Sequence, residues 1–383
     1  MDKPGFYEFF AGGGMARAGL GTDWQCLFAN DFDPKKGDSY RANWGEAEFH
    51  LGDIHKLKVQ DLPGKADLAW ASFPCQDLSL AGNGAGLAGE RSGAFWGFWN
   101  IVNALPKARR PKLLVIENVT GALTSNGGAD FVELCRALSS LGYLIGALTI
   151  DAANFLPQSR PRLFIVCCLK ALPGVADASQ SAPAAPWHSS ALVRAVEQLP
   201  AHAKASWRWW RLPAPVLNNA LLSDLIEEAP GDVAWHTREE TARLVSLMSD
   251  ANLQKLEAAK AAGKRIVGTI YRRTRLDEDG RKVQRAEVRF DGVAGCLRTP
   301  GGGSSRQFIM VVEKARVRTR LLSGREAARL MGLPDDYILP ARYNDAYHLL
   351  GDGLAVPAVK YLAENLLTKI LLSTSFSTLA AAE

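Results

Sequence analysis

The sequence predicts an α/β protein built on a doubly wound, mostly parallel sheet, with a second and smaller domain. Over the first 170 residues, short apolar runs alternate with longer mixed segments, which is the pattern of alternating strands and helices. A glycine-rich turn, Gly12–Gly14, follows the first apolar run, and polar residues directly follow several later runs. Because such sheets bind ligands at the carboxyl ends of their strands, the residues after each run are the candidates for a site.

The expected elements follow from these runs in order. The strands are Phe6–Phe10, Gln25–Ala29, Asp67–Ala71, Leu113–Glu117, Leu144–Ile150 and Leu163–Leu169, with a helix at Ala129–Leu141. Beyond them we expect a linker at Pro173–Ser190, a helix at Arg238–Ala262, a strand at Phe308–Val312, and helices near Arg325–Met331 and Pro357–Leu372. A chain of 383 residues exceeds one compact domain. We therefore expect a first domain at 1–172, a small domain at 173–345 that includes a tryptophan cluster (Trp187, Trp207, Trp209, Trp210), and a segment 346–383 that returns to the first domain.

Composition narrows the class of protein. With 47% hydrophobic and 22% charged residues, the chain matches a globular protein and not a disordered one. The polar start does not resemble a signal peptide, and apolar runs such as Leu163–Leu169 are too short to span a bilayer. The six cysteines show no spacing typical of zinc sites, so we expect free thiols and no metal. Together with the lack of a signal peptide and of a membrane span, this predicts a cytoplasmic protein. The net charge is +5, and Lys260–Arg289 holds ten Lys/Arg against four Asp/Glu. This excess of positive charge indicates either a solvent-exposed surface or a binding site for a polyanion.

The first candidate site is the turn Phe10-Ala11-Gly12-Gly13-Gly14, between a strand and a helix. Glycines permit close approach of a ligand, so a nucleotide-like cofactor fits, although an NAD site or plain tight packing fits the turn equally. Asp31 follows the second strand and could accept hydrogen bonds from ribose hydroxyls, while Phe32 could lie against adenine. Asp53, with Ile54 after it, could accept from the adenine amino group. The alternative is that both acids only cap helices or turns.

The second candidate site begins at Cys75, which follows the strand Asp67–Ala71 and is flanked by Pro74 and Gln76. The next strand ends in Glu117-Asn118, and Arg160 and Arg162 precede a later one. A thiol, a carboxyl and two guanidinium groups are thus expected near strand ends, where a thiolate could act as a nucleophile. The alternative is a buried core cysteine beside a surface ion pair.

Taken in order, these motifs resemble the C5-cytosine-specific DNA methyltransferases of bacterial restriction-modification systems. The matching blocks are Phe-Ala-Gly-Gly-Gly, Asn-Asp-Phe-Asp, Gly-Asp-Ile, Phe-Pro-Cys-Gln, Glu-Asn-Val, Gln-x-Arg-x-Arg, and two C-terminal blocks at 325–334 and 351–357. The resemblance covers residues 6–170 and 290–372. Asp31 replaces the commoner Glu, and Asp352-Gly353 replaces the commoner Asn-Ser.

The resemblance implies a Rossmann-like fold that binds S-adenosylmethionine and methylates carbon 5 of a cytosine flipped out of duplex DNA. Cys75 would add to C6, Glu117 would hold or protonate N3, and Arg162 with Arg160 would bind the exocyclic oxygen. The implied cofactor contacts are Phe10, Ala11, Gly12, Gly13, Gly14, Asp31, Phe32, Asp53, Ile54, Pro74, Asp352 and Leu354. The implied DNA or base contacts are Gln76, Asn118, Arg272, Arg273, Arg275, Arg298 and Thr299.

The expected partner is double-stranded DNA, with the enzyme acting as a monomer away from membranes and a cognate restriction endonuclease possible. A tRNA cytosine methyltransferase is the nearest alternative, but that branch carries Cys-Phe-Thr and no cysteine here precedes Phe-Thr. An amino-group DNA methyltransferase needs a different motif at the position of Ser72–Cys75. An NAD-dependent oxidoreductase leaves the cysteine and Glu-Asn-Val blocks unexplained, and a catalytically inactive relative would not retain every catalytic group.

Overall fold

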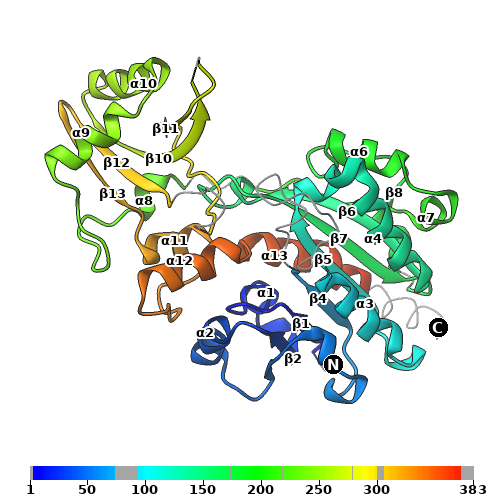
Figure 1. Cartoon of the computed structure of the whole chain (residues 1–383). Helices are drawn as coiled ribbons and strands as arrows, with labels where there is room; N and C mark the ends of the chain where they lie inside the picture. Colours follow the sequence, from blue (N-terminus) through cyan, green and yellow to red (C-terminus); the bar gives the residue numbers. More distant parts are fainter. Residues whose placement is uncertain are drawn as a thin grey trace. The chain divides into compact units, whose positions relative to one another are not determined.

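The computed structural model describes residues 3–73, 93–172, 174–216, 220–277, 279–299 and 306–371. The chain divides into two compact units, whose elements are labelled in Figure 1. Unit 1 comprises Met1–Asp151, Pro161–Pro215 and Ala358–Glu383, and unit 2 comprises Ala152–Arg160 and Val216–Pro357. This differs from the expected boundaries: the residues before 216 join unit 1, a short segment at 152–160 joins unit 2, and the return to unit 1 begins at 358 and not at 346.

The sheet of unit 1 has seven strands in the order β3-β2-β1-β4-β5-β7-β6. The strands are β1 (Gly5–Phe9), β2 (Gln25–Asp31), β3 (Phe49–Leu51), β4 (Leu68–Ala71), β5 (Leu113–Val119), β6 (Tyr143–Asp151) and β7 (Pro161–Leu169). The sheet is mostly parallel, as predicted, but β7 runs antiparallel to β5 and β6. The strand order reverses between β1 and β4, the position at which doubly wound sheets bind ligands.

Helices cover this sheet because its strands are apolar on both faces. The longer helices are α1 (Met15–Leu20), α2 (Pro34–Trp44), α3 (Ala94–Ala104), α4 (Ala129–Ser140), α6 (Ser190–Glu197) and α7 (Ala201–Ser206). Phenylalanines of α3 and α4 are buried in one cluster with Ile116 of β5 and Leu163 of β7. Asp33 caps α2 by accepting from the backbone N–H of Lys35, and Pro34 occupies the first turn, where a missing N–H costs nothing. Single-turn 3₁₀ helices lie at Gly21–Asp23, Ile54–Lys56, Val59–Asp61, Lys107–Arg109, Thr120–Leu123, Ser125–Gly128 and Ala152–Asn154.

The tryptophan cluster belongs to unit 1, which corrects the expectation that it forms the core of the small domain. Trp210 is fully buried and donates its Nε1–H to the carbonyl of Val166 at 3.0 Å. A side chain at Gly146 would lie 2.4 Å from that same nitrogen, so the indole fills space that the glycine leaves open. The predicted linker likewise forms ordered structure here, α5 (Val175–Ala178) and β8 (Ser179–Gln180), and β8 pairs with β9 (Trp209–Trp210).

Unit 2 is built on an antiparallel sheet in the order β11-β10-β12-β13. Its strands are β10 (Arg265–Leu276), β11 (Lys282–Arg289), β12 (Phe308–Glu313) and β13 (Arg316–Leu321). Leucines of α9 (Arg238–Ser246) and α10 (Asp250–Ala261) pack with apolar residues of β10, β11 and β12. The basic stretch 260–289 therefore includes a β-hairpin, which its charge pattern alone did not predict.

The predicted helix at Arg238–Ala262 is in fact the two helices α9 and α10. The backbone leaves helical geometry at Ser249, and the carbonyl of Leu247 accepts from the N–H of Ala286 on β11 at 2.9 Å. This hydrogen bond joins the C-terminal end of α9 to β11, and the helix ends there. The remaining helices are α8 (Leu222–Leu225), α11 (Gly324–Leu330), α12 (Tyr343–Asp352) and α13 (Val356–Leu362), which continues as a π-helical turn, Ala363–Leu367. No helix within the described ranges has the length and hydropathy of a membrane span.

Candidate active site

The glycine-rich turn after β1 has left-handed backbone at three of its positions. Phe10, Gly12 and Gly14 have positive φ angles of 59°, 56° and 77°, a region that a non-glycine residue such as Phe10 rarely occupies. The N–H of Ala11 donates to the carbonyl of Asn30 at 2.9 Å, which ties the turn to β2. The strained turn thus stands at the strand-order reversal, between β1 and α1.

Asp31, at the end of β2, is held against this turn. Its carboxyl accepts from the N–H of Gly12 at 2.8 Å and from the N–H of Asp33 at 2.9 Å. Burial raises the pKa of Asp31, which is 6% exposed, although these two hydrogen bonds and Lys36 act in the opposite direction. The neighbouring Phe32 is 68% exposed, which is unusual for a large apolar ring. A buried carboxyl beside an exposed ring is an arrangement that suits a nucleoside.

Asp53 and Ile54 follow β3, as expected. Asp53 is exposed and accepts from the N–H of His55 at 3.0 Å, which caps a 3₁₀ turn, and Ile54 is buried. The structure therefore shows the capping role for this acid, and it leaves the side chain accessible to a ligand. The expected cofactor residues Asp352 and Leu354 belong to unit 2, where Asp352 ends α12 and is exposed and Leu354 is buried.

The expected nucleophile, Cys75, and its neighbours Pro74 and Gln76 lie outside the described residues. The segment that leads to them is described. After β4, the N–H of Ser72 donates to the carbonyl of Phe9 at 3.4 Å, and Phe73 is buried against Phe95 of α3. The backbone that precedes Cys75 thus runs beside the start of the glycine-rich turn.

Glu117 and Arg162 form an ion pair at the same edge of the sheet. Their Oε1 and Nε atoms are 3.2 Å apart, and the side chains are 10% and 15% exposed. The pairing register explains the contact: Arg162 of β7 is opposite Val119 of β5, and Glu117 is on the same face as Val119, one diagonal step away. Because β7 runs antiparallel to β5, its first residues lie beside the last residues of β5. Arg162 and Glu117 therefore lie close together.

Asn118 connects the two strand ends. Its side-chain amide donates to the carbonyl of Phe73 at 3.4 Å, and its side-chain oxygen accepts from the N–H of Val119 at 2.9 Å. Asn118 is 3% exposed, so these contacts are protected from water. The side chain that was expected to hold the base or the loop therefore holds the backbone directly before Pro74.

Arg160 is placed differently from Arg162. It belongs to unit 2, is 1% exposed, and donates from Nη1 to the carbonyl of Leu297 at 2.8 Å. Its Nη2 donates to the carbonyls of Gly351 and Gly353 at 2.9 Å and 2.6 Å. Since the guanidinium is engaged by backbone in this way, the structure gives no support to a role for Arg160 at the base, and Arg162 alone carries that role below.

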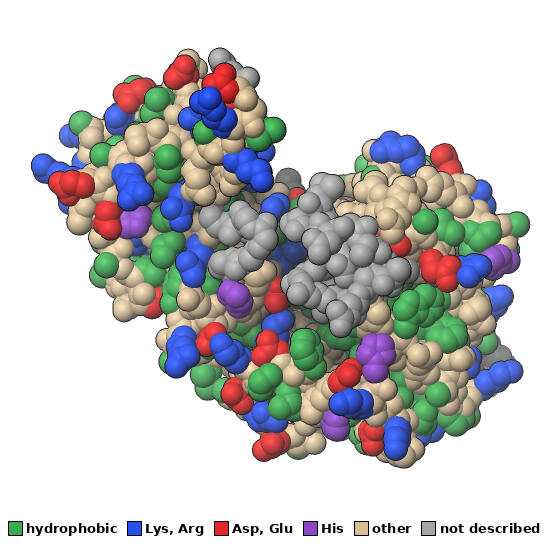
Figure 2. All heavy atoms as spheres, in the orientation of Figure 1, with side chains coloured by type: hydrophobic (Ala, Val, Ile, Leu, Met, Phe, Trp, Pro, Cys, Tyr) green, Lys and Arg blue, Asp and Glu red, His purple; other side chains and the backbone are tan. Residues whose placement is uncertain are grey.

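Three of the four arginines expected to contact DNA, Arg272, Arg273 and Arg275, lie on β10 and are exposed. Arg273 and Arg275 share one face of the hairpin, and both contact Glu287 of β11, with Nε–O distances of 3.2 Å and 2.7 Å. Arg272 is on the other face, with its guanidinium 5.2 Å from the ring centre of Phe308. Arg298 is exposed and Thr299 is half-buried, at the end of a described segment. Lys and Arg side chains occur with Asp and Glu on the visible face of this unit (Figure 2).

Sequence reasoning missed Trp44, which supports the glycine-rich turn from α2. Its Nε1–H donates to the carbonyl of Gly13 at 3.0 Å, and a side chain at Gly14 would lie 2.3 Å from the same nitrogen. The guanidinium of Arg17 lies 5.1 Å from the indole ring centre. The signal that could have found Trp44 is a large aromatic residue at the end of a mostly polar helix.

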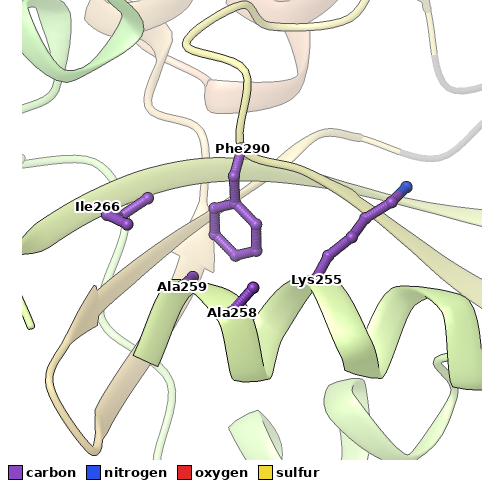
Figure 3. A pocket seen from close by; sticks show the side chains of 5 residues that line it. All are labelled: Lys255, Ala258, Ala259, Ile266 and Phe290. Carbon is purple, nitrogen blue, oxygen red and sulfur yellow. The ribbon is translucent and has the colours of Figure 1, made fainter. Parts of the chain in front are cut away.

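A separate cavity of about 320 Å³ lies in unit 2, between α10 and the sheet (Figure 3). Lys255, Ala258, Ala259, Ile266 and Phe290 line it, and none of these is an expected site residue. Nζ of Lys255 is 3.5 Å from the carbonyl of Val288. Within the described residues, no group of three or more His, Cys, Asp or Glu side chains could hold a metal ion.

Comparisons with known proteins agree with this architecture. A methyltransferase from Entamoeba histolytica, EhMeth, matches the structure with a TM-score of 0.64 at 13% identity, covering 98% of this chain and 99% of that one. The Dnmt2 methyltransferase of S. pombe matches with a TM-score of 0.56 at 17% identity, covering 97% and 99%. The fold is therefore that of these methyltransferases.

The sequence comparisons define the family. The model of the C-5 cytosine-specific DNA methylases matches residues 5–368. The Type II methyltransferase M.BsuFI of Bacillus subtilis is 28% identical over 370 residues, which cover 96% of this chain and 73% of the relative. The chain belongs to the C-5 cytosine-specific DNA methylase family, and it is a DNA (cytosine-5)-methyltransferase.

Proposed function

We propose that the protein transfers a methyl group from S-adenosylmethionine to carbon 5 of a cytosine that is flipped out of a specific duplex sequence, through a covalent bond between Cys75 and C6. The observation that carries the proposal is the Glu117–Arg162 ion pair at the end of β5, together with the contact from Asn118 to the backbone that leads to Cys75. The reaction needs a carboxyl, a guanidinium and a thiol, and the chain that leads to Cys75 leaves β4 beside the strand that carries the first of these groups.

The residues around the glycine-rich turn fit the cofactor. The glycines let a ligand approach the backbone closely, Asp31 is suited to ribose hydroxyls, and the exposed Phe32 ring is suited to an adenine face. Asp53 with Ile54, Pro74, Asp352 and Leu354 complete the proposed set. When bound, S-adenosylmethionine supplies an electrophilic methyl group.

The chain's own residues prepare the cytosine. The Cys75 thiolate adds to C6, and the electron pair of the C5–C6 bond moves to make C5 nucleophilic. Glu117, held by Arg162, holds or protonates N3, so that the charge that develops on the ring is stabilised. Arg162 donates to the exocyclic oxygen. After C5 has been methylated, water removes the C5 proton and the Cys75–C6 bond breaks, which restores the thiolate and the aromatic ring.

Unit 2 is proposed to read the DNA. Arg272, Arg273, Arg275, Arg298 and Thr299 would contact phosphates and base edges, with Gln76 and Asn118 near the flipped base. We further propose that the enzyme acts as a monomer on bacterial DNA in the cytoplasm, with a restriction endonuclease of the same recognition sequence as its partner. The curated relatives are Type II methyltransferases from bacteria, which supports this setting.

Bisulfite sequencing of DNA from cells that express the enzyme first identifies the methylated position. The test then uses a duplex that carries 5-fluorocytosine at that position. In the presence of S-adenosylmethionine, a covalent adduct is expected at Cys75, because fluorine at C5 cannot leave as a proton does. Cys75→Ser should form no adduct. Cys168→Ala should form it normally, since burial raises the pKa of the Cys168 thiol to about 12 and keeps it protonated. Methylation of an exocyclic nitrogen, or preference for tRNA over duplex DNA, contradicts the proposal.

A further inference from the structure

Arg160 joins two segments of unit 2 that are distant in the sequence. One guanidinium donates to Leu297 on one side and to Gly351 and Gly353 on the other, at 2.6–2.9 Å. The side chain is 1% exposed. A buried guanidinium stays charged and needs acceptors, so these three carbonyls are held at the positions that its planar group dictates.

Neighbouring contacts fix the first segment to the stretch that carries Arg160. Gln158, which is fully buried, accepts from the N–H of Leu297 at 3.2 Å, and the backbone of 157–159 pairs with Ala294. A side chain at Gly351 would lie 2.8 Å from the backbone nitrogen of Thr299, so the two segments pack backbone to backbone. A shift in one segment must therefore move the other or break buried hydrogen bonds.

We propose that Arg160 is a positioning residue that couples DNA binding to cofactor binding. The inference rests on the proposed function, in which Arg298 and Thr299 face DNA, and Asp352 and Leu354 face the cofactor. Arg160 holds the backbone just before the first pair and around the second. A ligand that orders one segment also orders the other. DNA therefore raises the affinity for the cofactor, and the cofactor raises the affinity for DNA by the same factor.

The experiment measures the dissociation constant of a duplex carrying the methylated site, with and without S-adenosylhomocysteine, for the wild type and for Arg160→Lys. In the wild type, S-adenosylhomocysteine should tighten DNA binding roughly fivefold or more, and DNA should tighten S-adenosylhomocysteine binding equally. Lysine keeps the charge but lacks the planar fork, so in Arg160→Lys the factor should fall towards one.

Arg325→Lys is the matched control. Arg325 also donates from both Nη atoms to backbone carbonyls of unit 2, those of Pro334 and Tyr337 at 3.3 Å and 3.0 Å, but it contacts neither segment. This variant should keep the wild-type factor. If the role of Arg160 is merely structural, Arg160→Lys is less stable than the wild type but keeps the wild-type factor.

Two results overturn the proposal: no mutual tightening in the wild type, or a wild-type factor in Arg160→Lys. If Arg160→Lys does not fold, hydrogen exchange of the wild type decides. S-adenosylhomocysteine should slow exchange of the Leu297 and Arg298 amides, and an unchanged rate rejects the coupling. Failure of the proposed function would give a different result from failure of the coupling. The enzyme would then bind DNA, but the DNA would never carry 5-methylcytosine.

Discussion

Asn118 donates its side-chain amide to the carbonyl of Phe73, from the end of β5 to the segment that follows β4. This buried hydrogen bond holds the last described residue before Pro74. In Asn118→Ala the carbonyl of Phe73 loses its partner, at a cost of about 1 kcal/mol, so we expect kcat to fall roughly fivefold. Tritium transfer under saturating DNA and cofactor measures it. An unaltered kcat together with a raised KM for DNA would instead assign Asn118 to binding alone.

The Arg162–Glu117 pair is expected to act in the transition state. Arg162→Lys replaces a planar donor group by a single ammonium and loses the Nε contact to Glu117. We expect kcat/KM to drop by about 10²–10³ while the dissociation constant of DNA stays nearly constant. Arg136→Lys, in the exposed Arg136–Glu133 pair of α4, is the control and should be neutral. Wild-type turnover in Arg162→Lys would remove this residue from the mechanism.

Trp44 is expected to set cofactor affinity. Trp44→Phe keeps a ring beside Gly14 but removes the hydrogen bond to Gly13, so S-adenosylhomocysteine should bind roughly fivefold more weakly by calorimetry. Trp99→Phe is the matched control, because Trp99 donates to the carbonyl of Ala137 at 2.9 Å in the same unit. Equal losses of affinity in the two variants would argue against a specific role for Trp44.

Unit 2 contains a buried ion pair whose loss should be costly. Arg320 and Glu326 are both fully buried, with two N–O contacts of 2.6 Å and 2.7 Å. Glu326→Gln leaves the guanidinium uncompensated, so urea denaturation should show a loss of about 3–5 kcal/mol. Asp335→Asn, in the exposed pair with Arg329, should cost under about 1 kcal/mol. A loss for Glu326→Gln as small as that of the control would disprove the assignment.

Glu8 in β1 should make stability depend on pH. Its carboxyl is 1% exposed, and burial raises its pKa from 4.5 to about 8, despite opposing effects of Arg17 and the backbone N–H of Ala16. Between these two pH values the folded state binds more protons than the unfolded state, so this group lowers stability as pH rises, on the order of 1.4 kcal/mol per pH unit. Glu8→Gln should lose that slope, whereas the exposed Glu133→Gln should keep it. Denaturation series at pH 5 to 8 provide the comparison.

The sequence predicted those features of the fold and of the site that depend on residues close together in the chain. Six of the seven strands of the large sheet, the glycine-rich turn, and Glu117 with Arg162 follow from apolar runs and the residues that end them. Long-range packing was not predictable in this way. Trp210 joins unit 1 because Gly146 leaves room for its ring, and the predicted helix 238–262 breaks because Leu247 bonds to β11. Arg160 and Arg162 look equivalent in the sequence, yet their environments differ completely, since burial depends on residues more than a hundred positions away.

The chain passes between the two units at 151/152, 160/161, 215/216 and 357/358, so neither unit is one continuous stretch. An exchange of recognition modules between relatives at 216 and 357 would leave behind Arg160, which donates to the carbonyls of Leu297, Gly351 and Gly353. It would also leave behind Gln158, which accepts from the N–H of Leu297. A chimaera that takes its recognition module from a relative should therefore fold and function only when residues 152–160 come from the same relative.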